Sequence, residues 1–269
     1  MPSEQESPRL QPFAAMPGSA LARLRVLAAD IDDTITAGGK LPARTLDLLG
    51  KLEAAGLVVV LVTGRPAGWA QALAGYLPGV SLVVGENGLV SFDGAGRRRD
   101  LGPPRDASFA RALADNAERV ARAFALIRTP DDTFRLFERA FLRPDGFDAN
   151  ALRGCQQLVD AGFEVMASSI HIHVRPSGWD KADGLLAGLA AVLPAAVAEA
   201  DASILFVGDS SNDRPLFARF SRTSVGVHNV VRFLAELGED RPAYITEGEA
   251  AAGFAEVCER LLAARRCAL

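Results

Sequence analysis

The chain has 269 residues, of which 49% are hydrophobic and 23% charged, and its formal net charge at pH 7 is −4. This composition is that of a globular protein, and it excludes a disordered chain, a collagen and a small disulfide scaffold. The negative balance argues against a nucleic-acid binder, whose phosphate partner needs a basic surface. No stretch reaches the roughly 18 consecutive apolar residues that cross a bilayer, so we expect no membrane association.

The cysteines and the N-terminus both favour a cytoplasmic location. Cys155, Cys258 and Cys267 are an odd, widely spaced set with no CxxC pair, which is typical of reduced thiols. Residues 1–17 lack the apolar region of a signal peptide. We therefore expect residues 1–20 to be a disordered tail, with Met16 as a candidate alternative start.

The first part of the folded chain alternates strands and helices. Residues 24–29, 57–62 and 82–84 are apolar runs, and residues 45–55 carry leucines on one helical face. A strand that is apolar at every position is covered on both faces. Residues 21–88 therefore predict a parallel sheet with crossover helices.

The pattern changes between residues 89 and 178. Helical patterns cover 107–126 and 149–161, a strand is expected at 163–167, and residues 134–142 are ambiguous between strand and helix. This stretch is interpreted as a separate α+β module.

Within that module, residues 169–175 alternate strictly between apolar and polar side chains. Ile170, Ile172 and Val174 would face one way, and His171, His173 and Arg175 the other. This alternation predicts an antiparallel strand with one solvated face.

After residue 180 the parallel pattern returns. A helix to about residue 193 precedes apolar runs at 204–207, 225–227 and 244–246, and an amphipathic helix is expected at 254–264. The predicted fold is α/β: a doubly wound, Rossmann-like parallel sheet core formed by residues 21–88 and 179–269, with an α+β cap of residues 89–178 inserted in it.

Three of the predicted strands end in polar residues. They are followed by Asp30-Ile-Asp32, by Thr63-Gly64-Arg65, and by a Gly-Asp-x-x-Asn-Asp segment that contains Asp209, Asn212 and Asp213. Ligands of an open parallel sheet bind beyond the carboxyl ends of its strands, so these side chains are expected to converge there, with Lys181 as a candidate cation.

Carboxylates gathered at one place repel one another unless a positive charge lies among them. A hard divalent cation, Mg²⁺, suits such a set because it prefers oxygen ligands and keeps phosphate oxygens and water as the others. A metal, a lysine and backbone N–H groups together form a cradle for a phosphoryl group.

The order of these motifs closely resembles that of the haloacid dehalogenase-like (HAD) phosphohydrolase superfamily, from about Leu24 onward. The chain is most similar to the Cof-type subgroup that carries a large cap between the second and third motifs, where phosphatases of sucrose phosphate and mannosyl-phosphoglycerate belong. One departure is Asp33, which stands where a glycine is commonest.

The resemblance implies a role for each motif residue. Asp30 would be the nucleophile that forms an aspartyl-phosphate, and Asp32 the general acid and base. Mg²⁺ would be held by Asp30, the Asp32 carbonyl and Asp209, with Asp213 in support. Phosphate oxygens would be bound by Thr63, Gly64, Lys181 and Asn212.

The substrate-recognition residues are left open by the sequence. Asn87 stands where the family commonly places a substrate-contacting asparagine, but a hinge turn explains it equally well. His171, His173 and Arg175 would either grip the substrate or form an ordinary solvated face. Arg135, Arg139 and Arg143 would share a basic face with Phe137 and Phe141 only if their segment is a strand.

These expectations add up to an Mg²⁺-dependent phosphatase that hydrolyses a small phosphate monoester, a sugar phosphate or a glycosyl-phosphoglycerate. The alternatives are a phosphoglycolate phosphatase-like enzyme, a phosphosugar mutase, which returns the phosphoryl group to its substrate, and a non-catalytic sensor of a phosphorylated ligand. The partner is then a small phosphorylated molecule, with no nucleic acid and no membrane, and the oligomeric state is open.

Overall fold

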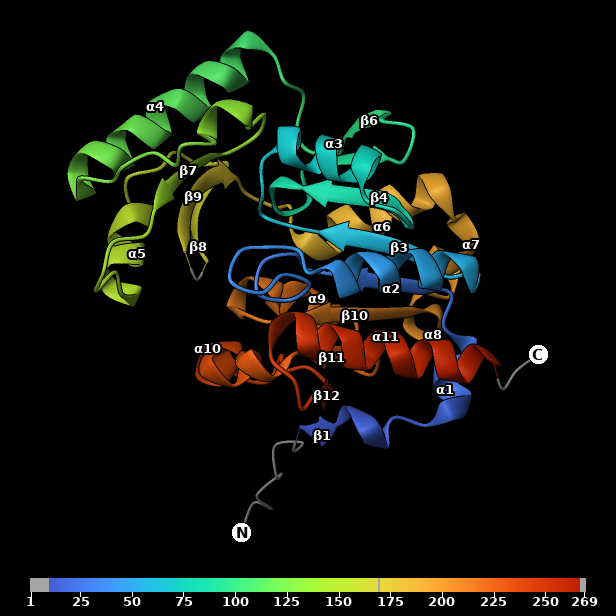
Figure 1. The fold of residues 1–269 in the computed structure, drawn as a ribbon. Coiled ribbons are helices and arrows are strands. Elements are labelled where there is room, and N and C mark those ends of the chain that lie inside the picture. The colour runs from blue at the N-terminus through green and yellow to red at the C-terminus, as the bar shows by residue number, and fades with distance from the viewer. Residues whose placement is uncertain (1–9, 169, 267–269) are drawn as a thin grey trace. The chain divides into compact units, whose positions relative to one another are not determined.

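The computed structural model describes residues 10–168 and 170–266, which form two compact units (Figure 1). The first unit holds the described residues up to Leu61, the segment Leu77–Ser81, and the described residues from Leu189 onward. The second unit holds Val62–Tyr76 and Leu82–Gly188. The second unit is therefore larger than the expected cap of residues 89–178.

The first unit is built on a parallel sheet. Its strands lie in the order β1 (Gln11–Pro12), β12 (Tyr244–Ile245), β11 (Ser224–Gly226), β10 (Ile204–Gly208), β2 (Val26–Ala29) and β3 (Val58–Val62). All residues of β2 and β10 are buried, as their uninterrupted apolar sequences predict. The parallel sheet and its helices confirm the predicted α/β class.

The register of the two central strands, β10 and β2, brings the segments that follow them to the same end of the sheet. Val207 of β10 pairs with Ala29 of β2, so Asp30 and Gly208 both follow directly at the same end of the sheet. Outside the sheet, α2 (Ala43–Ala54) and α11 (Ala250–Arg266) lie side by side (Figure 1). The other helices of this unit are α1 (Gly18–Arg23), α7 (Pro194–Ala198), α8 (Ala200–Ser203), α9 (Arg214–Arg219) and α10 (Leu234–Leu237).

Residues 10–20 differ from the expected tail. They contain β1, a 3₁₀ turn at Phe13–Ala15 and the start of α1. The Phe13 ring is fully buried and lies 5.1 Å from the Arg260 guanidinium. Burial of this aromatic ring explains why residues 10–20 are packed rather than a free tail. One buried ring in so short a segment gives no periodic pattern that the sequence could reveal. Residues 1–9 of the expected tail lie outside the described residues.

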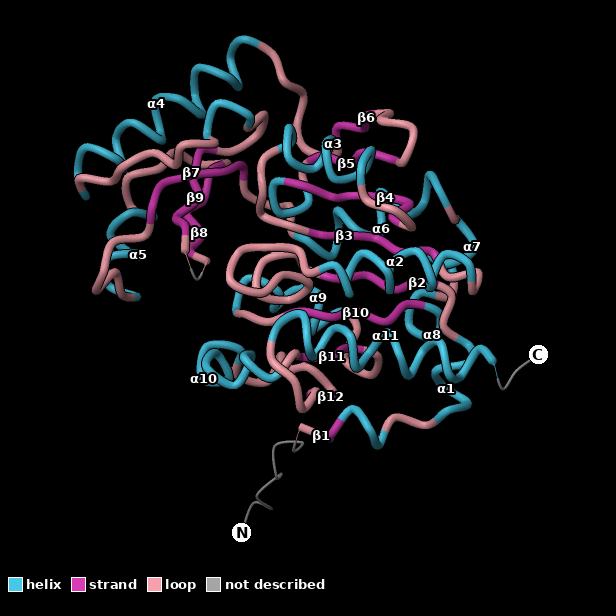
Figure 2. Tube along the Cα trace, viewed as in Figure 1, coloured by secondary structure: helices cyan, strands magenta, loops and turns pink. Residues whose placement is uncertain are grey.

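The second unit contains two sets of antiparallel strands. One set is β4 (Val80–Gly85, which enters this unit at Leu82), β5 (Val90–Asp93) and β6 (Arg98–Asp100). It is flanked by α3 (Ala67–Tyr76) and by α6 (Lys181–Val192, which leaves this unit after Gly188). The other is a three-stranded sheet in the order β7 (Arg139–Leu142), β9 (His171–Pro176) and β8 (Phe163–Ala167). Figure 2 shows this small sheet with α4 (Ala107–Phe124) and α5 (Ala149–Gln156).

The small sheet has one apolar face. Phe141, Val165, Ile172 and Val174 pack against residues of α4 and α5 to form a hydrophobic core. Because side chains alternate along a strand, His171, His173 and Arg175 of β9 lie on the opposite face, as predicted. That face is not solvated, however: His173 is 2% exposed and Arg175 1% exposed, which corrects the expectation of a solvated face.

Two further findings concern the expectations drawn from composition. No helix among the described residues is both long and apolar enough to span a membrane. Cys155 and Cys258 are buried free thiols, while Cys267 lies outside the described residues.

Candidate active site

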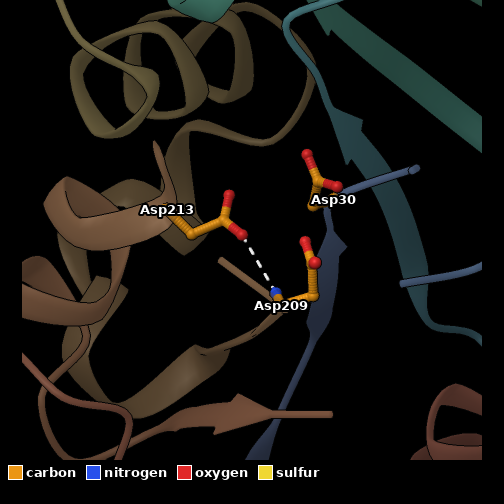
Figure 3. A group of neighbouring side chains, drawn as sticks. All are labelled: Asp30, Asp209 and Asp213. Atoms are coloured by element: carbon orange, nitrogen blue, oxygen red, sulfur yellow. Dashed lines mark hydrogen bonds between the residues drawn. The ribbon is translucent and has the colours of Figure 1, made fainter. Parts of the chain in front are cut away.

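Three aspartates form a buried acidic cluster in the first unit (Figure 3). Asp30, Asp209 and Asp213 each offer a carboxylate oxygen, and these oxygens all lie within 4.8 Å of one another. None of the three residues is more than 5% exposed. Three buried like charges this close repel one another, and only oxygen atoms are offered, so the cluster fits a hard divalent cation.

Asp213 is held in place by the turn that follows β10. Its Oδ2 atom accepts hydrogen bonds from the backbone N–H of Asp209 at 3.0 Å, drawn in Figure 3, and of Ser210 at 3.4 Å. Gly208 makes this approach feasible, since a Cβ at that position would lie 2.5 Å from Asp213 Oδ2. The glycine and aspartate of the Gly-Asp-x-x-Asn-Asp motif are therefore needed together.

Asn229 contacts the acidic cluster and was missed by sequence reasoning. Its Nδ2 donates to Asp209 Oδ2 at 3.2 Å and to the Asp33 carbonyl at 3.1 Å, while its Oδ1 accepts from the Ala250 N–H at 2.9 Å. One side chain thus links three loops around the cluster. The available signal was its position: it follows β11, the strand next to β10, at the carboxyl end.

Asp32 and Asn212, the other predicted residues of the first unit, are half-buried. Asp32 lies in the segment after β2, two residues beyond the buried Asp30. Its side chain is not part of the group of three carboxylates. Asn212 Oδ1 accepts a hydrogen bond from Ser210 Oγ at 2.8 Å. Asn212 therefore lies within the turn that carries Asp209 and Asp213.

The second unit contains the predicted phosphate-binding loop. Thr63 is 1% exposed; its N–H donates to Val84 O at 2.8 Å and its hydroxyl accepts from the Arg65 N–H at 3.0 Å. The Asn87 side chain packs on Gly64, where an added Cβ would lie 3.0 Å from Asn87 Oδ1. Thr63, Gly64 and Asn87 are therefore neighbours, although they come from separate segments.

Lys181 is the first residue of α6 and is only 1% exposed. Asp180 caps this helix, because its Oδ1 accepts from the N–H groups of Ala182 and Asp183, each at 2.8 Å. Gly88 has φ +105°, and an added Cβ there would lie 2.0 Å from Asp180 O. Only glycine allows this close approach, which brings the start of α6 against the Glu86-Asn87-Gly88 turn.

Glu86 is a fully buried carboxyl group that connects two parts of the second unit. Its Oε1 accepts from the N–H of Ala67, the first residue of α3, at 3.0 Å and of Leu136 at 2.7 Å. Its Oε2 accepts from the N–H of Phe137 at 2.7 Å and of Glu138 at 3.2 Å. Burial and the neighbouring Glu138 carboxylate raise the pKa of Glu86 above its usual value.

A second buried carboxyl group, Glu138, gathers the polar residues around it. It accepts from Arg135 Nη1 and Asn87 Nδ2, the latter at 3.1 Å, and bonds His173 Nδ1 at 3.0 Å. Burial alone would raise the pKa of Glu138, but His173 and Arg135 outweigh burial and lower that pKa. Asn87 and His173, predicted separately from sequence, therefore meet at one carboxylate.

The arginines of the second unit bond to different kinds of partner, unlike those of a uniform basic face. Arg175 Nη2 donates to the Trp179 carbonyl at 2.6 Å, just before α6, and its Nε lies 3.5 Å from Glu164 Oε1. Arg143 donates to the carbonyls of Ser168 and Phe147, and Arg139 to those of Arg135 and Glu138. Arg135, in contrast, donates to the Glu138 carboxylate and to the Gly64 carbonyl.

His171 should make the protein less stable at mildly acidic pH. Burial, His173, Arg135 and Arg65 lower its pKa from 6.5 to about 4. The unfolded chain then binds a proton below pH 6.5 that the folded protein does not, so stability falls as pH drops from 6.5 towards 4. Allowing for solvent screening of this partly exposed ring, we expect His171→Gln to recover about 1–2 kcal/mol of that loss. Urea unfolding between pH 7 and 4 measures it, and parallel stability curves for the two proteins would contradict it.

Residues 27–95 match the family model of haloacid dehalogenase-like hydrolases. The chain is 29% identical over 250 residues to a protein named phosphoglycolate phosphatase from Pyrobaculum neutrophilum, covering 91% of this chain and 98% of that one. A protein of the same name from Pyrobaculum islandicum is 30% identical over 163 residues, but the match spans only 66% of that protein and 59% of this chain.

Solved structures share the fold. A protein from Thermoplasma acidophilum superposes with a TM-score of 0.67 at 19% identity, covering 88% of this chain and 98% of that one. The sucrose-phosphatase of Synechocystis gives 0.61 at 18% identity, with 89% and 98% covered. The C-terminal domain of trehalose-6-phosphate phosphatase from C. albicans gives 0.65 at 14% identity, with 94% and 98% covered.

The parallel sheet with buried aspartates at its strand ends defines an α/β protein with an oxygen-rich candidate metal site. The family match covers β2 with Asp30, β3 and the turn after β4. Over residues 27–95, the chain is therefore similar to the haloacid dehalogenase-like hydrolases.

Proposed function

We propose that the protein is a phosphatase that hydrolyses a small phosphate monoester with the help of Mg²⁺. The observation that supports this most is the set of three buried carboxylates, Asp30, Asp209 and Asp213, beyond the ends of β2 and β10, in a chain that is similar to haloacid dehalogenase-like hydrolases over residues 27–95. These residues would hold the cation, with the Asp32 carbonyl as a further oxygen ligand. Bound there, Mg²⁺ would neutralise charge on the phosphoryl oxygens.

The reaction we propose has two steps. In the first, an oxygen of the Asp30 carboxylate attacks phosphorus, the bond to the ester oxygen breaks, and protonated Asp32 donates its proton to the leaving oxygen. In the second, Asp32 takes a proton from a water molecule that attacks phosphorus, which releases phosphate and restores the Asp30 carboxylate. Asp32 is suited to this exchange because it is half-buried and therefore retains contact with solvent.

The phosphate-binding residues are proposed from their motif order. Thr63 and Gly64 would donate a hydroxyl and an N–H to phosphoryl oxygens, and Lys181 would balance their negative charge. Asn212 would orient the phosphate or the lysine. The burial of Thr63 and Lys181, each 1% exposed, supports these roles, because charge-assisted bonds are stronger where water is excluded.

Two substrate classes remain as candidates. The relatives by sequence carry the name phosphoglycolate phosphatase, and two of them align over 250 residues at 29% and 25% identity. The named sugar-phosphate phosphatases are similar in fold at 18% identity or less. The sequence relatives therefore favour a small organic-acid phosphate over a sugar phosphate.

The purified protein should release inorganic phosphate from a phosphate monoester. This phosphate release should stop when EDTA removes divalent cations, and it should resume when Mg²⁺ is added in excess. The panel comprises 2-phosphoglycolate, sucrose and trehalose 6-phosphates and a mannosyl-phosphoglycerate, with phosphate and remaining substrate both quantified. Full activity of the metal-free protein would exclude the cation, and substrate loss without equal phosphate release would favour a mutase. Binding without turnover across the panel would favour a sensor.

A further inference from the structure

Arg135 uses only one side of its guanidinium group in the structure. Its Nη1 donates to the Gly64 carbonyl at 2.9 Å and to Glu138 Oε1. The other two nitrogens, Nε and Nη2, are buried and have no hydrogen-bond partner among the described residues. The arginine side chain carries its positive charge at every working pH, so two of its charged donor groups lie buried without an acceptor.

The unused nitrogens form one edge of the guanidinium plane. An N–H of Nε and an N–H of Nη2 point in the same direction, at a spacing that matches the two oxygens of a carboxylate. Leaving such donors buried and unpaired costs free energy, which an anion bound at this edge would remove. The donor geometry and the charge of this edge therefore match a planar anion.

No side chain in the described part of the chain is bonded to that edge. The carboxylate of Glu138, the closest acid, is already bonded to Arg135 Nη1, Asn87 Nδ2 and His173 Nδ1. Glu86, the next buried acid, accepts four backbone N–H groups. Asp131 Oδ2 lies 3.8 Å from Arg65 Nη1, and its buried Oδ1 has no hydrogen-bond partner among the described residues, Arg135 included. The edge is therefore left without an acceptor among the described residues, and a small anion from outside the chain would supply one.

The position of Arg135 relates this edge to the substrate. The Nη1 atom of Arg135 donates a hydrogen bond to the carbonyl of Gly64, the residue proposed to bind the phosphoryl group. The anion on the other edge would then lie about one guanidinium width from that loop. In a two- or three-carbon acid phosphate, the carboxylate and the phosphoryl group are separated by a similarly short span.

We propose that Arg135 is a specificity-determining residue whose Nε–Nη2 edge binds a carboxylate on the leaving group of the substrate. The substrate class is then a phosphate monoester of a small hydroxy acid, rather than of a neutral sugar. Glu138 fixes the guanidinium orientation, and His173 and Asn87 fix Glu138. This inference rests on the proposed phosphatase function.

The test compares two esters that differ only at the carboxylate, 2-phosphoglycolate and 2-hydroxyethyl phosphate. In the wild type, kcat/KM for 2-phosphoglycolate should exceed that for 2-hydroxyethyl phosphate by about 10- to 100-fold, as expected for a charge-assisted bidentate contact. Arg135→Lys keeps the charge but has no parallel pair of N–H groups. It should lose about that factor on 2-phosphoglycolate and change little on 2-hydroxyethyl phosphate.

Arg128→Lys is the matched control, because Arg128 belongs to the same unit but pairs with Asp132 and is 41% exposed. It should leave the preference between the two esters unchanged. Equal losses on both esters in Arg135→Lys would overturn the inference and assign Arg135 to support of the Gly64 loop. If Arg135→Lys does not fold, the wild-type protein alone provides the test. A wild-type ratio of kcat/KM for 2-phosphoglycolate to kcat/KM for 2-hydroxyethyl phosphate near one then overturns the inference. Hydrolysis of neither ester, nor of any other phosphate monoester, would overturn the proposed function itself.

Discussion

Replacing Asp30 by asparagine should abolish phosphate release, lowering kcat by about 10⁴-fold or more. Asparagine has the shape of aspartate, but its amide neither attacks phosphorus as a carboxylate oxygen does nor carries the charge that attracts a cation. Phosphate release at saturating Mg²⁺ measures the effect. Near-normal turnover would exclude Asp30 as the nucleophile.

The same variant should fold at least as stably as the wild type when no metal is present. Asp30 lies within 4.8 Å of two other buried carboxylates, so removing one charge relieves repulsion. Thermal unfolding in EDTA should give an equal or higher Tm for Asp30→Asn, and added Mg²⁺ should raise the Tm of the wild type more than that of the variant. A lower Tm in EDTA would show that Asp30 supports the fold through its charge.

Asp33→Asn is the control for both measurements. Asp33 is three residues further along the same loop, but it is exposed and outside the acidic cluster. Its φ of +54° is one that asparagine tolerates well, so the exchange adds no backbone strain. Activity and Mg²⁺ response of this variant should stay close to those of the wild type.

Replacing Glu86 by alanine should cause the largest loss of stability among single changes in the second unit. Four backbone N–H groups, from Ala67 and from the three residues 136–138, would lose their acceptor inside the protein. Unsatisfied buried donors and the cavity together should cost about 3–5 kcal/mol in the free energy of unfolding. Urea unfolding at pH 7.5 measures the loss.

Glu86→Gln should fall between alanine and the wild type, because the amide retains one acceptor oxygen for two of the four N–H groups. Glu53→Ala, an exposed change on α2, should cost less than about 1 kcal/mol and serves as the control. If Glu86→Ala unfolds at nearly the same urea concentration as the Glu53 control, the four hydrogen bonds do not hold this region together.

The acidic cluster illustrates what a sequence reveals well. Asp30 follows one apolar run, Asp209 and Asp213 lie in the turn after another, and the parallel pairing of β2 with β10 brings the ends of the two runs together. Fully apolar strands indicate parallel pairing by themselves, and parallel pairing puts their carboxyl ends on one edge. The convergence of these three residues was therefore predictable without coordinates.

The residues around Glu86 and Glu138 illustrate the opposite case. Asn87, Arg135 and His173 lie far apart in the sequence and meet only because a buried carboxylate pairs with all three. The alternation of residues 171–175 indicates which side chains share a face but not whether another segment covers that face.

The sequence by itself determined the α/β class, the strand ends that carry the acidic residues, and the resemblance to the haloacid dehalogenase-like hydrolases. The tertiary structure alone decided that Asn229 links the loops around Asp209, that Phe13 anchors the N-terminal segment, and that one edge of Arg135 has no acceptor within residues 10–168 and 170–266. The physical reason is that strand and helix periodicity is local along the chain. The partner of a buried polar group is set by whichever distant segment packs against it.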